Sequence, residues 1–127
     1  MQDSMLYKAL MESADAFIAK WEVQVRKGVL EFVILLSLAA REQYGFELIS
    51  GVSRRARLDV SEGTLYPLLL RLVKDALVST RLAQGDGGAP RKYYALTPRG
   101  QIVLAAMTAS WTRLTGSVDA MLAGARA

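Results

Sequence analysis

Positively charged side chains are concentrated between residues 77 and 100 of a chain whose formal charge is +4. The basic residues of this stretch are Arg81, Arg91, Lys92 and Arg99. Its one acidic residue is Asp86, so these cations are largely unopposed along the sequence. Guanidinium and ammonium groups arranged in this way can bind the phosphates of a polyanion. Loops are usually polar, so the charge alone is also compatible with a solvated hairpin.

Catalytic and metal-binding chemistry has little support in this chain. It contains no cysteine and no histidine, which excludes thiol redox chemistry, the usual structural zinc sites and any Ser–His or Cys–His nucleophile pair. No pair of acids, metal-ligand cluster or nucleophile with its base is visible among the other residues. We therefore expect a protein that is not an enzyme and that has no metal and no cofactor.

Residues 60–100 have the pattern of a helix, a strand, a Gly-rich loop, a second strand and a second helix. Ser61 is a candidate N-cap, and leucines follow it at helical spacing. Residues 77–82 and 91–96 favour extended structure, while Thr97 and Pro98 suit the start of a helix. This order predicts a winged helix-turn-helix, which inserts one helix into a DNA major groove and lays a basic hairpin against the flanking backbone.

Further helices are expected before this unit. A helix over residues 4–26 carries one apolar stripe. The stripe consists of Leu6, Leu10, Ala14, Phe17, Ile18, Trp21 and Val25. Gly28 is expected to begin a separate, strongly apolar helix that ends near Arg41. A turn at residues 43–45 then leads to a helix over roughly residues 46–57. The stripe helix would be marginal by itself, so its apolar face needs a partner.

The last helix carries apolar residues in alternating steps of three and four, which is the pattern of a coiled-coil seam. They are Leu104, Met107, Trp111, Leu114, Val118 and Met121. A stripe of this length is typical of a helix that pairs with another, here in a second copy of the chain. Packing against residues 4–26 would also account for it, and both arrangements can coexist in an intertwined dimer.

The fold predicted from these patterns is mainly α with a small β-hairpin wing. Residues 1–27 form an N-terminal amphipathic helix, residues 28–96 a winged helix-turn-helix domain, and residues 97–127 a long C-terminal dimerisation helix. The apolar stretch over residues 29–40 is shorter than the about 20 residues that span a bilayer. No secretory signal is visible near the N-terminus. We expect a cytoplasmic protein with no membrane partner.

Several short motifs follow one another between residue 28 and about residue 100. They are Gly28-Val-Leu-Glu31, Tyr44-Gly-Phe-Glu47, Val60-Ser-Glu-Gly-Thr-Leu-Tyr-Pro67, Leu70-Arg-Leu72, Gly88-Ala-Pro-Arg-Lys-Tyr-Tyr94 and Leu96-Thr-Pro-Arg-Gly100. In this order they resemble the PadR family of bacterial transcriptional regulators, and the third and fifth motifs are the most specific. The chain departs from the family at Ala76, where a glycine is common in the turn after the recognition helix.

The resemblance implies a homodimeric, DNA-binding repressor. Its C-terminal helices would dimerise, and its wings would flank the recognition helices on a pseudo-palindromic operator in double-stranded DNA. Ligands in this family are often phenolic acids or flat hydrophobic compounds, so release from the operator by a small molecule or another signal is expected. The alternative is a winged-helix interaction module that docks a protein partner on residues 4–26, but the basic wing favours DNA.

Candidate DNA contacts lie before and within the recognition helix and in the wing. They are Tyr44, Ser61, Glu62, Gly63, Thr64, Tyr66, Arg71, Lys74, Arg91 and Lys92. The N-terminal turn of the recognition helix reaches base edges in this architecture, and the wing cations would contact phosphates. Some of these side chains could have a structural role and not a DNA contact, since Ser61 and Thr64 can cap the helix and Arg71 can pair with Asp75. Tyr44 and Tyr66 are also compatible with half-buried aromatics.

Aromatic residues outside this region are candidates for an effector site. In the resembled family, aromatic side chains of the last helix can line a ligand cavity between subunits, which makes Trp111 a candidate. Trp21 and Phe17 could line the same cavity if residues 4–26 cover it. The alternative is ordinary dimer core, which we favour because aromatic residues at helical spacing usually pack against protein.

Overall fold

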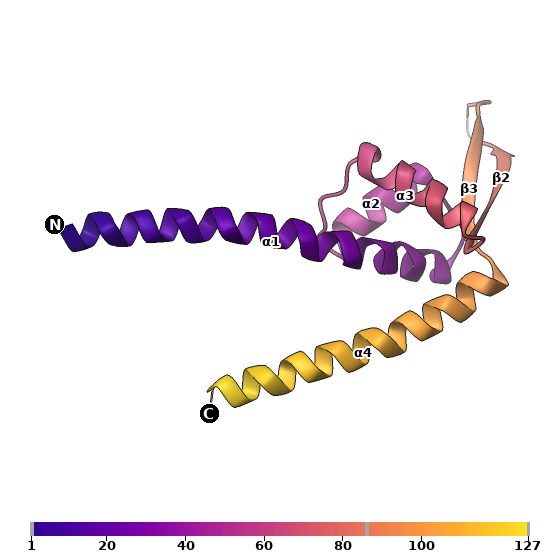
Figure 1. Ribbon diagram of the computed structural model, residues 1–127. Coiled ribbons are helices and arrows are strands. Elements are labelled where there is room, and N and C mark those ends of the chain that lie inside the picture. The colour runs from indigo at the N-terminus through magenta and orange to yellow at the C-terminus, as the bar shows by residue number, and fades with distance from the viewer. Residues whose placement is uncertain (1, 86, 127) are drawn as a thin grey trace. The chain divides into compact units, whose positions relative to one another are not determined.

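The computed structural model describes residues 2–85 and 87–126. Its elements are α1 (Gln2–Ala40), β1 (Gln43–Tyr44), α2 (Gly45–Arg55), α3 (Glu62–Lys74), β2 (Val78–Gln84), β3 (Pro90–Leu96) and α4 (Pro98–Arg126). Figure 1 shows α2 and α3 beside the β2–β3 hairpin, with α4 leaving the base of the hairpin. The predicted fold class, mainly helical with a small antiparallel wing, is confirmed.

The expected break at Gly28 was wrong, because α1 runs uninterrupted from Gln2 to Ala40. Glycine in a helix interior costs only about 1 kcal/mol relative to alanine, so the helix can continue through it. The compact units of the chain divide a little later, between Glu31 and Phe32 within α1. In the first unit the apolar stripe is exposed, with Phe17 at 69% and Trp21 at 52% of full exposure.

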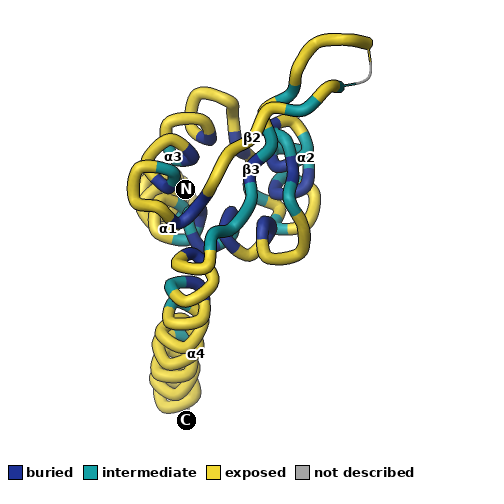
Figure 2. The backbone as a smooth tube through the Cα atoms, turned by 90° about the vertical axis from the view of Figure 1, so that its right-hand side faces the viewer, coloured by how far each residue is buried: buried dark blue, intermediate teal, exposed yellow. Residues whose placement is uncertain are grey.

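The core of the second unit forms where the end of α1, α2, α3 and the sheet meet. Its fully buried side chains are Ile34, Leu35, Leu48, Val52, Leu65, Leu69, Leu72 and Val78. Figure 2 shows the buried segments gathered there, whereas α4 is exposed along most of its length. Each buried aliphatic side chain contributes about 1.5–3 kcal/mol through removal from water, so this cluster fixes how α3 lies against the sheet.

The sheet has the order β1-β3-β2, and both pairs are antiparallel. The turn expected at residues 43–45 was wrong in part, since Gln43 and Tyr44 form a short strand. Tyr93 lies opposite Tyr44 on one side and opposite Arg81 on the other. Side chains alternate between faces along a strand, so these three share one face, while the buried Tyr94 belongs to the other.

The turn between α3 and β2 explains why Ala76 is unusual. Ala76 has a φ of 60°, in the left-handed region that glycine occupies without a penalty. The Leu77 amide bonds the Leu72 carbonyl and the Ala76 amide bonds the Val73 carbonyl, each at 3.0 Å. This is a Schellman ending, which satisfies the last carbonyls of the helix and turns the chain into the wing. Ala76, which stands where the family commonly has glycine, is therefore a strained residue.

Replacing Ala76 with glycine is expected to raise the free energy of unfolding by about 1 kcal/mol, because the left-handed conformation no longer crowds a Cβ. Urea denaturation of the purified protein measures the change. Ala56→Gly is the matched control, since Ala56 follows α2 with an ordinary φ of −91°. The control should be neutral or destabilising. Equal effects at the two positions would contradict the assignment of strain to Ala76.

The start of α4 is tied to that same turn. The Thr97 hydroxyl caps α4 by accepting a hydrogen bond from the Gly100 amide at 2.9 Å, and it donates to the Ala76 carbonyl at 2.6 Å. A Cβ at Gly100 would collide with the Leu77 carbonyl and come within 2.7 Å of the Leu96 side chain. The base of the hairpin and the root of α4 are therefore joined by close backbone contact.

Candidate DNA-binding surface

The N-terminal turn of α3 presents an open, polar surface. Ser61, Glu62, Gly63 and Thr64 are all exposed. Ser61 occupies the N-cap position, but its hydroxyl makes no capping bond to the backbone and instead lies 3.2 Å from the Thr64 hydroxyl. The side-chain cap expected at Ser61 was therefore wrong. Both hydroxyls have hydrogen-bonding capacity left for another partner.

Tyr66 lies one turn further along α3 and contacts the start of α2. A Cβ at Gly45 would collide with the Tyr66 hydroxyl and come within 2.9 Å of its Cε1 atom. Glycine at this position lets the ring lie against the backbone of α2, and the side chain keeps 41% of its full exposure. The Tyr66 ring is thus fixed against α2, while part of it remains exposed to solvent.

A hollow of about 180 Å³ connects α3 with the wing. It is lined by Tyr44, Gly45, Phe46, Tyr66, Arg91, Lys92 and Tyr94. Its polar groups are the cations of the wing and tyrosine hydroxyls, which are suitable partners for a phosphate oxygen. Burial raises the pKa of the Tyr94 phenol, and neighbouring Tyr66 raises it further. This hydroxyl therefore stays neutral at physiological pH.

A row of stacked side chains crosses the sheet on its outer face. Arg81 Nε donates to Glu42 Oε2 at 2.8 Å, and Arg81 Nη2 bonds the other carboxylate oxygen. The Arg81 guanidinium carbon lies 4.8 Å from the Tyr93 ring centroid. The Tyr93 and Tyr44 rings meet edge to face with centroids 5.7 Å apart, and the Arg91 guanidinium carbon lies 4.5 Å from the Tyr44 centroid. We call Glu42, Arg81, Tyr93, Tyr44 and Arg91 the wing stack.

Arg91 is also in contact with the tip of the hairpin. A Cβ at Gly85 would come within 2.7 Å of Arg91 Nε and 2.8 Å of its Cγ and Cδ atoms. The tip is itself closed by the Gly85 amide, which bonds the Ala89 carbonyl at 3.1 Å. The Arg91 side chain therefore lies between the Tyr44 ring and the backbone of the hairpin.

The predicted contacts do not all lie together. Tyr44, Tyr66, Arg91 and Lys92 surround the hollow. The exposed turn that begins at Ser61 belongs to the same helix as Tyr66. Arg71 and Lys74 are exposed in the last turn of α3, at the opposite end of that helix. The sequence interpretation missed Glu42 and Tyr93 and listed Arg81 only as part of the basic stretch. Strand alternation could have grouped Tyr93 with Arg81, but no local signal points to Glu42.

The ion pair of the wing stack predicts a titration. The hydrogen bond from Arg81 holds the pKa of Glu42 below its ordinary value, and the same bond raises the pKa of Arg81. A lowered carboxyl pKa means that the pair stabilises the fold above the ordinary pKa of glutamate and loses that effect as pH falls through the folded value. We expect Arg81→Met to return the pKa of Glu42 to its ordinary value in carboxyl ¹³C NMR. Lys92→Met, in the neighbouring strand β3 and on the opposite face of the sheet, should leave it lowered.

These elements define a winged helix-turn-helix protein, in which α3 occupies the place of the recognition helix and β2–β3 form the wing. Residues 34–106 match the model of the transcriptional regulator PadR-like family. The chain belongs to this family, which confirms the resemblance seen in the sequence.

Solved structures agree with this assignment. A PadR-like transcription factor from Bacteroides fragilis is 42% identical, with a TM-score of 0.68 over 80% of this chain and 98% of that one. A PadR-like transcriptional regulator from Bacillus cereus is 38% identical, with a TM-score of 0.72 over 78% and 96% of the respective chains. A PadR family transcriptional regulator from Eggerthella lenta is 29% identical, with a TM-score of 0.77 over 87% and 96%.

Membership of this family makes the chain a DNA-binding transcriptional regulator, and the family is not one of enzymes. Among residues 2–85 and 87–126, no helix combines the length and the hydropathy that crossing a bilayer requires.

Proposed function

We propose that the chain is a homodimeric repressor that binds a pseudo-palindromic operator and acts in the bacterial cytoplasm. This proposal rests on one observation, which is that Tyr66 of α3 lines the same hollow as Arg91 and Lys92 of the wing. A phosphate at that hollow would be contacted from both elements. The α3 turn that begins at Ser61 would then be inserted in the adjacent major groove.

The proposed contacts divide by chemistry. Arg91, Lys92, Tyr44 and Tyr66 would bind phosphate oxygens, which sets the position of the protein on the duplex. Ser61 and Thr64 have free hydroxyl capacity for a base edge or a phosphate, and Gly63 leaves room for close approach, since a Cβ there would meet nothing nearer than 3.8 Å. Glu62 would accept a hydrogen bond from a cytosine amino group, or its charge would interact favourably with the dipole at the start of α3. Arg71 and Lys74 would contact the backbone further along.

Dimerisation would use the seam of α4. Leu104 is buried in the single chain, but Leu114, Val118 and Met121 are 58%, 46% and 75% exposed. Trp111 is 40% exposed, and its ring lies 5.7 Å from that of Phe32. A continuous row of exposed apolar side chains is costly in water, and a second copy of α4 would cover it. Residues 97–127 are accordingly the proposed dimerisation segment. The proposed DNA-binding domain covers residues 28–96, and the N-terminal segment 1–27 contributes the first part of the continuous helix α1 (Gln2–Ala40).

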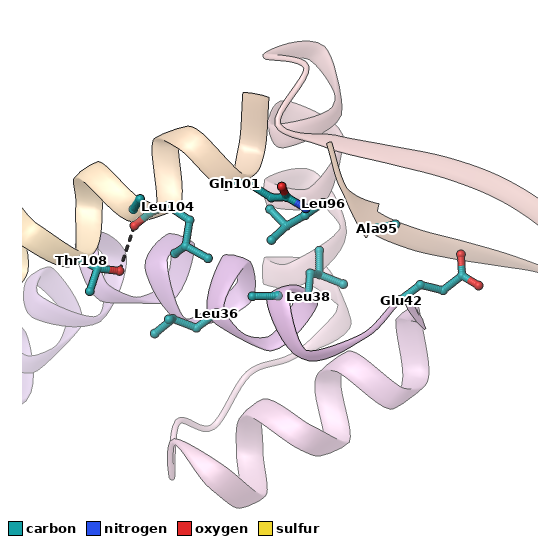
Figure 3. A pocket seen from close by; sticks show the side chains of 10 residues that line it. Leu36, Leu38, Glu42, Ala95, Leu96, Gln101, Leu104 and Thr108 are labelled. Atoms are coloured by element: carbon teal, nitrogen blue, oxygen red, sulfur yellow. Dashed lines mark hydrogen bonds between the residues drawn. The ribbon is translucent and has the colours of Figure 1, made fainter. Parts of the chain in front are cut away.

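An effector would bind close to this seam. A cavity of about 570 Å³ lies between the end of α1, β3 and α4, lined mostly by apolar residues (Figure 3). Leu104 and Thr108 of α4 line it, and Trp111 follows one turn later. This volume is ordinary for sites that hold flat hydrophobic compounds such as phenolic acids. Trp21 and Phe17 remain candidates for covering such a compound. Release of the dimer from DNA requires that the effector bind more tightly to a dimer conformation whose wings do not fit the operator.

Selection of bound duplexes from a random-sequence pool tests the central proposal. We expect recovery of a pseudo-palindrome whose half-sites lie about 10 base pairs apart, or a small multiple of that. A footprint on the selected sequence then gives the spacing directly. If the full chain enriched no duplex yet captured a protein through residues 4–26, the protein-interaction module would be the better description.

The effector proposal has its own test. A panel of phenolic acids is added to the complex with the selected operator, and release is followed by gel shift. Ala105 lines the cavity, so Ala105→Trp should fill it and abolish release. Ala109→Trp, one turn later and outside the lining, is the matched control and should respond normally. Release that survives Ala105→Trp would move the effector site elsewhere.

A further inference from the structure

The hairpin is attached to the rest of the domain by few backbone hydrogen bonds. β1 contributes only two residues, paired with Tyr93 and Tyr94 of β3. β2 pairs with β3 over its whole length, but that pairing lies within the hairpin itself. A two-stranded hairpin is only marginally stable by itself, so side-chain contacts with the rest of the domain decide how it is held. The direction of Arg91 relative to α3 therefore depends on side chains that link the hairpin to the core.

The wing stack supplies that link. Arg81, Tyr93 and Tyr44 are directly opposite one another across the three strands, so their side chains form a continuous row. Glu42 lies between the end of α1 and β1, and its two carboxylate oxygens accept hydrogen bonds from Nε and Nη2 along one edge of the Arg81 guanidinium. A bidentate pair of this kind fixes orientation as well as distance. One end of the row is thus fastened to the core, and the other end is Arg91.

Arg91 benefits from being held before DNA arrives. A free arginine side chain has about 2 kcal/mol of rotamer entropy to lose when it is ordered. In the stack its guanidinium already lies over Tyr44, and its stem lies along Gly85. Among the described residues that line the hollow, neither Glu42 nor Arg81 nor Tyr93 is present. These residues have the geometry to act on DNA binding through Arg91 and not by contact.

We propose that Glu42 and Arg81 are positioning residues, which hold Arg91 through Tyr93 and Tyr44 in the orientation that meets a DNA phosphate. This inference rests on the proposed function, because it assumes that Arg91 contacts the duplex. A positioning role and a merely electrostatic role predict opposite changes in DNA affinity when Glu42 is replaced. Glu42 is an anion beside a polyanion-binding surface, so its simple removal should strengthen binding. As a positioning residue, its removal weakens binding.

The decisive variant is Glu42→Gln, tested on the selected operator by fluorescence anisotropy. We expect affinity to fall by about 3- to 10-fold, which is in the lower part of the range of coupling between groups in contact. In an Arg91→Ala background the same change should have no further effect, because the residue it positions is gone. Asp119→Asn, which removes an anion from α4, is the control and should not weaken binding. Unchanged or tighter binding by Glu42→Gln, or an equal loss in both backgrounds, would overturn the proposal.

A second series tests the ring in the middle of the row. Tyr93→Phe keeps the stacked ring and should bind DNA as the parent does, whereas Tyr93→Leu should weaken binding. Thermal melts of each variant show whether the domain is still folded. If Tyr93→Leu does not fold, the comparison of Glu42→Gln with its Arg91→Ala double variant still decides the matter.

The positioning step can be observed without DNA. In the free parent protein we expect the Arg91 Nε–Hε group to give a sharp NMR signal shifted by the Tyr44 ring, and Glu42→Gln should move it toward the value of a free arginine. An Arg91 signal that does not change overturns the inference. If the signal changes but the parent protein binds no duplex, the proposed function has failed and the stack remains a device for ordering Arg91.

Discussion

Replacing Arg91 and Lys92 together with alanine is expected to weaken operator binding by about 100-fold or more at physiological salt, because charge-assisted bonds of this kind contribute about 1.5–3 kcal/mol each and two are lost from each wing. The two cations line the same hollow as Tyr66. Their loss would leave α3 able to enter the groove without the phosphate clamp that orients it. Fluorescence anisotropy on the selected operator measures the change.

The salt dependence of that binding separates contact from general charge. Each phosphate contact adds about 0.9 to the slope of log affinity against log salt, so the double variant should lose about 1.8 per wing. Arg113→Ala with Arg126→Ala removes the same formal charge from α4 and is the matched control. A slope that stays at the parent value in the wing variant would remove the wing from the mechanism, whatever the loss of affinity.

Placing aspartates at Leu114 and Val118 is expected to convert the protein into monomers. Both side chains are exposed in the single chain and lie on the seam proposed to pair with a second α4. Carboxylates buried against apolar partners in a helical pair cost several kcal/mol, so the dimer constant should weaken on the order of 1,000-fold or more. Sedimentation equilibrium measures the change directly. Operator affinity should fall with it, because one α3 and one wing then bind alone.

The control for this variant adds the same charges off the seam. Ala109 and Ala123 lie on the opposite side of the heptad from Leu114 and Val118. Ala109→Asp with Ala123→Asp should therefore leave the dimer intact and bind the operator as the parent does. Monomers in both variants would indicate a general effect of charge on α4, and dimers in both would place the subunit contact elsewhere.

The wing and seam variants fail in different ways if the proposals are wrong. The wing variant should remain dimeric and fold normally, because Lys92 is exposed and Arg91 is only partly buried. The seam variant should keep its hollow, because no residue of α4 lines it. Loss of DNA binding in one and of dimerisation in the other would show that the functions belong to separate parts of the chain.

Much of the architecture was predictable because its signals are local. Leucines at helical spacing after Ser61, strand-forming runs on either side of a Gly-rich tip, and Thr97-Pro98 at the start of α4 each depend on neighbours within a few residues. They gave α3, the hairpin and α4 in the right order. The hydroxyl of Thr97 does cap its helix, but that of Ser61 does not. Both are compatible with the same local pattern, and only their surroundings separate them.

What the sequence alone determined is the class of protein, since a winged helix-turn-helix follows from the order of elements and from motifs that occupy consecutive residues. Only the tertiary structure decided which charged side chains form ion pairs. Glu42 and Arg81 are 39 residues apart, and they meet because β1 joins the edge of the hairpin. The αL conformation of Ala76 and the continuity of α1 through Gly28 were likewise decided by packing and chain context. Contacts between distant residues depend on how elements pack, and no local pattern carries that information.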